Sequence, residues 1–181
     1  SPNNTILNSN LSENNHDFDV LAYEDLECNN QLINVTGSNN KPIAYYNSSS
    51  IVSGQELSEL ILCNADYSSF SNISILASTS KDNNGMYIYR TDNSYFSNID
   101  SSYNYDGIWS SDSTNNILTG ITTNSNFADG IHLSSSQNNI ILNSILSENG
   151  LEDFDVSVFK DIDCNNQLIN VTGSNNKPIA Y

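Results

Sequence analysis

The chain has 181 residues, which is enough for one domain with a hydrophobic core. Asparagine and serine supply 32 and 30 of these residues, and 21 acidic residues against 5 Lys and Arg residues leave a formal net charge of -16. Nucleic acids and anionic membranes are therefore disfavoured as partners, because both repel an acidic surface without a basic patch, and no apolar run is long enough to span a membrane.

A long internal repeat governs the organisation of the chain. The segment NNQLINVTGSNNKPIAY at residues 29–45 returns unchanged at residues 165–181. Residues 1–45 as a whole correspond to residues 136–181, with one residue inserted between Asn149 and Phe154. We therefore predict a single continuous domain over residues 1–181, built on a 136-residue module.

A shorter period divides this module into coils. Six apolar residues follow polar corners at similar intervals, and their sequence numbers increase by 38, 26, 22, 23 and 27 in turn: Leu32, Phe70, Phe96, Leu118, Ile141 and Leu168. Short strands at this period predict an all-β, right-handed parallel β-helix with coils of about 22–27 residues, five to the module. The longest step contains residues 36–60, which we expect to form a long inserted coil with a protruding loop.

A second series of short strands indicates which side chains point outward. The series is GMYI at 85–88, GIWS at 107–110, GIHL at 130–133 and the related DVSV at 155–158. Strand alternation predicts that their second residues point inward and their third residues point outward, which are Tyr87, Trp109, His132 and Ser157. This alignment puts Ser157 in the place that follows His132.

The three cysteines do not indicate a metal or redox site. Cys28, Cys63 and Cys164 lack CxxC spacing and an accompanying group of histidines, so zinc, haem and thiol redox sites have no support. A disulfide stays open. Because Cys28 and Cys164 occupy one position in two repeats, the interpretation that we favour is a small buried hydrophobic residue.

Six N-x-S/T sequons are candidates for glycosylation, at Asn3, Asn10, Asn34, Asn47, Asn72 and Asn170. Asparagine at a coil corner also tolerates left-handed backbone, and stacked amides can bond to one another as a ladder. Five of the sequons lie at or near such corners. Asn47, in the long coil, is the best placed to carry a glycan.

The corners SSSQNNIILNS and STNNILTGI, the GIxL strands and the stretch NNKPIAYYNSSSIVSGQELSELILCNADYSSFSNISI carry a resemblance to a known group of proteins. The chain resembles right-handed parallel β-helix repeat proteins of the NosD and carbohydrate-binding sugar-hydrolase, or pectate-lyase-like, type. It is most similar to the Asn-rich, adhesin-like surface proteins of methanogenic archaea. This resemblance implies a secreted or cell-surface location and a structural or adhesive role.

Two outward features are candidates for a site. Asp106 and Asp129, each before a glycine on neighbouring coils, could hold a cation such as Ca2+, although repeated turn dipeptides explain them more simply. The column Tyr87, Trp109 and His132 could stack on sugars or meet a protein, although aromatic ladders also form for stability alone.

No cofactor other than Ca2+ is indicated. A copper role of the NosD kind would need His, Met or Cys ligands, and one methionine with separated cysteines does not supply them. The acid, base and metal-ligand sets of β-helix lyases and hydrolases are not visible either, so we do not expect an enzyme.

These observations favour a structural role for the protein. We expect an extracellular element of a cell-surface fibre, filament, stalk or surface layer, with copies or tandem modules stacked end to end. The alternative is a carbohydrate-binding adhesin module, or a polysaccharide lyase or hydrolase, that acts on surface glycans at the outer face.

Overall fold

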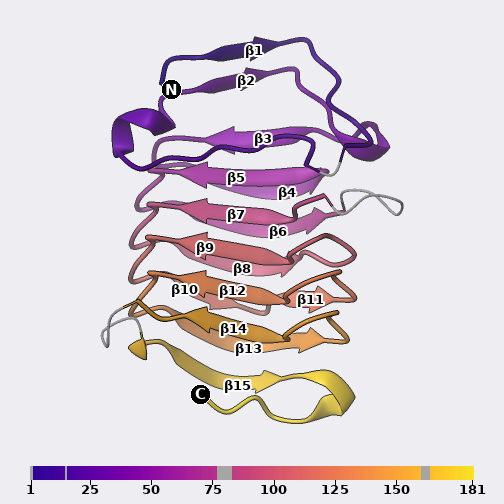
Figure 1. Ribbon diagram of the computed structural model, residues 1–181, viewed down its shortest axis with the longest axis vertical. Helices are drawn as coiled ribbons and strands as arrows, with labels where there is room; N and C mark the ends of the chain where they lie inside the picture. The colour runs from indigo at the N-terminus through magenta and orange to yellow at the C-terminus, as the bar shows by residue number, and fades with distance from the viewer. Residues whose placement is uncertain (1, 15, 77–82, 160–163) are drawn as a thin grey trace.

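The computed structural model describes residues 2–14, 16–76, 83–159 and 164–181, and these form a stack of parallel β coils (Figure 1). The fold predicted from the sequence, an all-β parallel β-helix, is confirmed. Helical structure in the described residues consists of short 3-10 turns, which include η1 Asp25–Cys28, η2 Ser38–Asn40 and η4 Ser174–Asn176. None of the helices in this part of the chain has the length and apolar character needed to cross a membrane.

One wall of the helix is a six-stranded parallel sheet, which we call the front sheet. Its spatial order is β14-β12-β9-β7-β5-β3, so each strand lies beside the equivalent strand of the next coil. Its strands are β3 Ile43–Tyr46, β5 Glu59–Cys63, β7 Met86–Tyr89, β9 Ile108–Ser111, β12 Ile131–Ser134 and β14 Phe154–Ser157.

The opposite wall is a seven-stranded parallel sheet, which we call the back sheet. Strands β10 and β11 belong to one coil, and both pair with β8 on one side and with β13 on the other. Its strands are β4 Ile51–Leu57, β6 Ser69–Ile75, β8 Tyr95–Asp100, β10 Ile117–Thr119, β11 Thr122–Asn124, β13 Ile140–Ser147 and β15 Gln167–Thr172.

The hydrophobic core lies between the two sheets, because alternate residues of each strand point inward. The apolar column predicted from the period is present on the back sheet, where consecutive coils are in register at Phe70, Phe96, Leu118, Ile141 and Leu168. Phe70 and Phe96 are fully buried and stack with ring centroids 5.9 Å apart. Like residues therefore pack on like residues along the helix axis.

The long step between Leu32 and Phe70 contains an additional coil. Within residues 36–60, β3 pairs with β5 in the front sheet and β4 pairs with β6 in the back sheet. Strand β4 places Val52 beside Phe70, and these two residues are closer in sequence than any other neighbours in the apolar column. The 136-residue module thus holds six front-sheet strands, from β3 to β14, where the sequence period predicted five coils.

The N-terminal segment forms an outer layer over the first front-sheet strands. Strands β1 Thr5–Leu7 and β2 Gln31–Ile33 pair only with each other among the described strands. The outward side chains of Ile61 on β5 and Tyr87 on β7 are buried in a second apolar cluster with Val35 and Ile43. The helix therefore has apolar packing outside its front sheet as well as inside.

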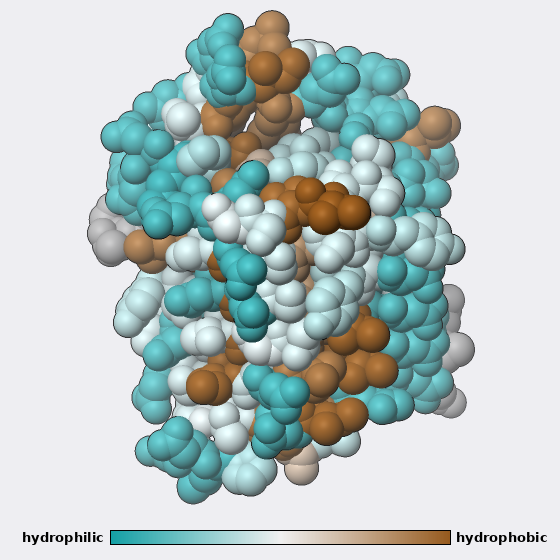
Figure 2. Space-filling model, turned by 180° about the vertical axis from the view of Figure 1, so that it is seen from behind, coloured by the Kyte–Doolittle hydropathy of each residue, from teal (hydrophilic) through white to brown (hydrophobic). Residues whose placement is uncertain are grey.

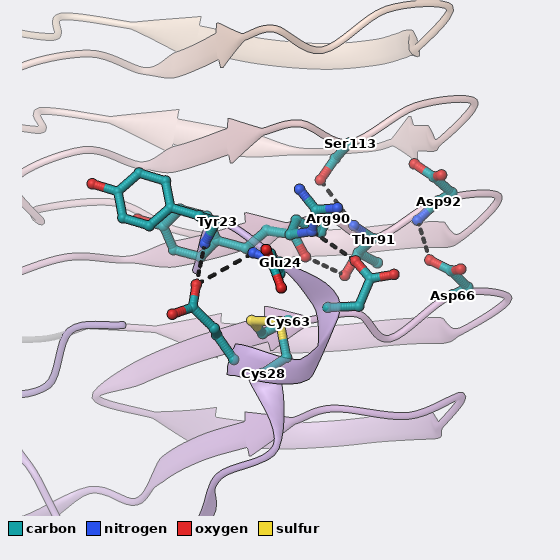
Figure 3. Close-up of polar contacts among 12 residues, drawn as sticks. Tyr23, Glu24, Cys28, Cys63, Asp66, Arg90, Thr91, Asp92 and Ser113 are labelled. Carbon is teal, nitrogen blue, oxygen red and sulfur yellow. Dashed lines mark hydrogen bonds and ion pairs between the residues drawn. A yellow bond between two sulfur atoms is a disulfide. The ribbon is translucent and has the colours of Figure 1, made fainter. Parts of the chain in front are cut away.

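A disulfide attaches this layer to the helix. Cys28, at the end of η1, is bonded to Cys63 of β5, with their Cα atoms 5.2 Å apart (Figure 3). Arg90 Nε lies 2.7 Å from Asp25 Oδ1 and holds the same turn from the next coil. Cys28 is buried, as the sequence favoured, but it forms a disulfide, whereas Cys164 is exposed and carries a free thiol. The interpretation as a small buried hydrophobic residue is therefore wrong for Cys164 and missed the disulfide of Cys28. The repeat did not reveal the disulfide, because Cys63 lies on the outward side of β5 and the period does not show that Cys28 folds back over that side.

Polar ladders run along the corners, as the paired asparagines predicted. One corner carries one Ser or Asn from each of six successive coils. The backbone N–H of each of these residues donates to the side-chain oxygen of the next in the series Ser50, Ser68, Ser94, Asn116, Asn139 and Asn166. These residues are buried or half-buried from Ser50 to Asn166. The ladder satisfies turn backbone that would otherwise be buried without a partner.

The rear surface of the stack is mainly polar, with one group of adjoining apolar side chains in the lower part of the view and others that stand singly (Figure 2). Among the exposed residues of the back-sheet strands are Ile51, Tyr95, Ile117, Ile145 and Ile169. Exposed apolar side chains of this kind are common on a folded surface and do not by themselves mark a binding face.

Candidate functional site

The outward side chains of the front sheet form one continuous column on its last four strands. Tyr87 of β7, Trp109 of β9 and His132 of β12 are consecutive partners in the sheet register, as the sequence predicted. Asp155 of β14, and not Ser157, is the next residue in register after His132. The predicted alignment is therefore shifted by two positions at β14, where an inserted residue separates the repeats.

The aromatic part of this column is more covered than the sequence indicated. Tyr87 is only 6 % exposed, because the N-terminal layer lies over it. Its ring meets Trp109 at an interplanar angle of 83° and a centroid distance of 6.1 Å, and Trp109 stacks on His132 at 15° and 4.7 Å. Trp109 thus lies between two protein rings, which does not suit it for stacking on a sugar.

The acids before the glycines connect coils. Asp106 Oδ1 accepts the backbone N–H of Asp129 at 3.0 Å, and Asp129 Oδ1 accepts that of Glu152 at 3.0 Å. The glycines are not in left-handed turns; a Cβ on Gly107 would lie 2.5 Å from the backbone oxygen of Gly130. Close packing of successive coils, and not turn conformation, therefore explains the Asp-Gly pairs.

Burial shifts the ionisation of two groups in this region. Desolvation raises the pKa of Asp106, and the nearby carboxylate of Asp129 raises it further. Desolvation likewise raises the pKa of the Tyr87 hydroxyl well above its ordinary value, and the adjacent Tyr89 and acidic side chains add to this effect. Tyr87 therefore stays neutral at physiological pH.

The structure brings three residues together in a cluster, which we call the His132 cluster: Asp129, His132 and Asp155. His132 Nδ1 lies 3.1 Å from Asp129 Oδ2 and 3.1 Å from Asp155 Oδ2. On the other side of the ring, Nε2 lies 3.1 Å from the hydroxyl of Ser157. The side chains of Asp129 and His132 are 12 % and 14 % exposed, and that of Asp155 is 38 % exposed, so the cluster is reached by solvent from one side.

Sequence reasoning finds two members of this cluster and misses the third. Asp129 and His132 are singled out separately, as one of an acidic pair and as one of an aromatic column. Asp155 is placed in the strand but at the wrong register. The signal that could have found it is the alternation itself, because Phe154 and Val156 are the apolar residues that match Ile131 and Leu133.

The side chains of the sequon asparagines differ in their hydrogen bonds and in their exposure. Three are rungs of amide ladders between coils, in the pairs Asn34–Asn8 at 3.0 Å, Asn98–Asn72 at 3.3 Å and Asn170–Asn143 at 2.9 Å. Asn47 is half-buried, and its Nδ2, where a glycan would be attached, donates to the carbonyls of Cys28 and Asn30 at 3.2 and 3.3 Å. Asn3 and Asn10 are exposed. Attachment at Asn47, the site favoured by the sequence, would require both of its hydrogen bonds to break.

The side chains present define which metal ions the chain could hold. Met86 is fully buried in the core, and Cys28 and Cys63 are bonded to each other, so the described residues offer no thiolate and thioether set for Cu+. The His132 cluster offers one imidazole and two carboxylates, a donor set that suits Cu2+ or Zn2+. It is the only group of three or more such ligands in the described part of the chain.

Comparison with known proteins places the chain in a family. A family model described as "Periplasmic copper-binding protein (NosD)" matches residues 63–178, which is 116 of the 181 residues. Comparison with curated proteins and with solved structures gave no match. The matched span runs from the end of β5 to the turn after β15 and contains the whole His132 cluster. Since this match covers more than half of a chain with the parallel β-helix fold, the chain belongs to the NosD family.

Proposed function

We propose that this chain is a structural β-helix module of an extracellular protein, stacked in tandem or end to end to build a cell-surface fibre, filament, stalk or layer. One observation carries the proposal: several contacts between neighbouring coils at the joint of the modules are made twice in the molecule, once in each copy of the repeat. A protein selected for one binding site has no need to repeat these contacts, whereas a protein selected for length does.

The repeated contacts agree in detail. Asp17 Oδ2 accepts the backbone N–H of Ser38 at 2.6 Å, and Asp153 Oδ2 accepts that of Ser174 at 2.7 Å. The register of the strand pair β1–β2 also recurs in the pair β13–β15. Thr5 lies beside Gln31 in the first copy, and Ile140 lies beside Gln167 in the second. This joint is therefore specified by the local sequence of the module.

An extracytoplasmic location agrees with two features. The family description names a periplasmic protein, and the Cys28–Cys63 disulfide is stable in an oxidising compartment. The likeness to Asn-rich, adhesin-like surface proteins of methanogenic archaea, stated above from the corner motifs, extends this to the cell surface.

A carbohydrate-binding or polysaccharide-cleaving role is less well supported. Trp109 is half-buried and contacts the rings of Tyr87 and His132, and one oxygen of each of Asp106 and Asp129 accepts a backbone hydrogen bond. A glycosidase needs two carboxyl groups free to face the scissile bond. We therefore propose a structural role and not an enzymatic one.

The last strand of the back sheet provides the test. Leu168 of β15 is half-buried against the core, so a lysine there would place a charge where the proposed stacking packs another coil. Leu168→Lys should abolish concentration-dependent growth of rods, measured by sedimentation velocity and electron microscopy. Gln167→Lys, which adds the same charge at an exposed neighbouring position, should not.

The rods should show one further property. Six coils at about 4.8 Å predict an axial repeat of about 29 Å for each module. Circular dichroism would establish that both lysine variants are folded. Particles of the parent chain that stay short and monodisperse at every concentration would rule out end-to-end stacking.

A further inference from the structure

We propose that Asp129, His132 and Asp155 form a binding site for a divalent transition-metal ion, Cu2+ or Zn2+. This site is separate from the proposed structural role, because its three donors lie on the outer face of the front sheet and make none of the joint contacts described above. The argument rests on donor geometry, on the groups that orient the donors and on the charge around them.

The distances match those around a bound ion. Zn2+ and Cu2+ lie about 2.0–2.1 Å from imidazole nitrogen and carboxylate oxygen, so two donors at a right angle are about 3 Å apart. His132 Nδ1 is 3.1 Å from an oxygen of each carboxylate, and all three donor atoms lie within 4.8 Å of one another. Neither carboxylate needs to move far to coordinate one ion together with the imidazole.

Each inner donor is oriented by a second group, as in protein metal sites generally. The Ser157 hydroxyl lies 3.1 Å from Nε2 and can accept its proton, which leaves Nδ1 with a lone pair for a metal. Asp129 Oδ1 is held by the N–H of Glu152, so Oδ2 is the oxygen that faces the ring. Trp109 stacks on His132 and fixes the plane of the imidazole.

The charge of the surroundings favours a cation. Within the described residues, no lysine or arginine pairs with Asp129 or Asp155. Asp106, one coil away, is bonded to the backbone of Asp129, and its Oδ2 is buried without a hydrogen-bond partner in the described part of the chain. Three carboxylates thus surround one imidazole.

The donor set also separates the candidate ions. Ca2+ takes six to eight oxygen ligands and gains little from an imidazole, whereas Cu2+ and Zn2+ bind imidazole together with carboxylate. Asp19, the counterpart of Asp155 in the first repeat, belongs to no strand and so has no histidine paired with it, as Asp155 has in His132. The first copy of the repeat should therefore not bind these ions.

The chain contains a built-in reporter for the site. Trp109 is the only tryptophan, and its ring centroid lies 4.7 Å from that of His132. A Cu2+ ion on His132 should quench its fluorescence strongly. Titration of the untagged 181-residue chain with CuCl2 should give saturable quenching at one equivalent, and isothermal titration with ZnCl2 should give the same stoichiometry.

Four variants test the assignment. His132→Gln should lose the saturable quenching, and Asp155→Asn should weaken it by at least about tenfold. His16→Gln, which removes the only other histidine, and Asp19→Asn should leave the titration unchanged. Asp155→Asn provides a second test in case His132→Gln does not fold. Because Asp155 is partly exposed, its substitution should leave the fold intact.

Each result is decisive. Quenching that is unsaturable, or that survives in His132→Gln, would show that the three side chains only contact one another and would overturn the proposal. CaCl2 that competes with CuCl2 at equal concentration would overturn the assignment to transition metals. Neither result bears on rod growth, so failure of this site is distinguishable from failure of the structural role.

Discussion

Removal of the Cys28–Cys63 disulfide should destabilise the first coils of the helix and leave the last coils unchanged. The perturbation is Cys63→Ser, or reduction of the intact chain. The two cysteines are 35 residues apart, so the bond closes a loop that includes η2, β3, β4 and most of β5. It also holds η1 against the outer face of the front sheet, where the N-terminal layer covers Tyr87.

The magnitude follows from the loop length. In the chain-entropy treatment, a closed loop of this size restricts the unfolded chain by about 4 kcal/mol at 25 °C. For a domain of this length, such a change lowers the midpoint of thermal unfolding by roughly 10 °C. Because each coil contacts only its neighbours, we expect the loss of hydrogen-exchange protection to be concentrated in β3, β4 and β5.

The assay compares urea unfolding of the parent chain with and without reductant. Cys164→Ser is the matched control, since Cys164 is the repeat counterpart of Cys28 but is exposed and unpaired, and it should change stability by less than about 0.5 kcal/mol. Thiol titration of the unfolded, unreduced chain should count one free thiol. Three free thiols, or equal destabilisation by Cys164→Ser, would refute the reasoning.

Three further substitutions test the packing and its ionisation. Phe96→Ala should cost about 3–5 kcal/mol in urea unfolding because it removes a fully buried ring, whereas Tyr95→Ala, at a 44 % exposed neighbouring site, should cost less than about 1 kcal/mol. Gly107→Ala should cost about 1–3 kcal/mol, since its Cβ would lie 2.5 Å from the Gly130 oxygen; an unchanged midpoint would show that the coils can separate freely. Burial under the N-terminal layer raises the pKa of Glu59 well above 4.5, so the folded chain favours the neutral acid. The contribution of Glu59 to the free energy of unfolding should be fully present below pH 4.5 and should be lost as the pH rises through the folded-state pKa. Glu59→Gln should remove this decline, and a parent chain with the same urea midpoint at pH 5 and pH 9 would contradict it.

The coils could be predicted because their packing is local and repeated. An inward column such as Phe70, Phe96 and Leu118 requires an apolar residue once per coil, and that requirement is written directly into the sequence. The corner asparagines follow the same logic, because each bonds the equivalent corner of the adjacent coil. Period and residue type together were therefore sufficient for the fold class and for most of the outer column.

The features that escaped prediction depend on contacts outside this repeat. Cys28 meets Cys63 because an N-terminal layer folds back over β5, and periodicity contains no information about such a layer. The same layer buries Tyr87, which alternation correctly placed outward but could not show to be covered. Val52 and its coil were missed because Val52 lies closer in sequence to Phe70 than the period of the other coils allows, so an additional corner was taken for a loop.

The two copies of the acidic segment show that a site in a repeat protein belongs to a column of coils and not to a segment of sequence. Phe154–Ser157 forms β14 beside β12, which brings Asp155 to His132. The counterpart residues 18–21 contain the same Phe-Asp-Val sequence but form no strand, and Phe18 packs in the outer layer against Tyr45. Identical acids therefore differ in chemistry because the preceding strand differs. A single histidine on one coil, placed where the next coil presents an aspartate, is enough to give a uniform structural repeat one distinct binding position.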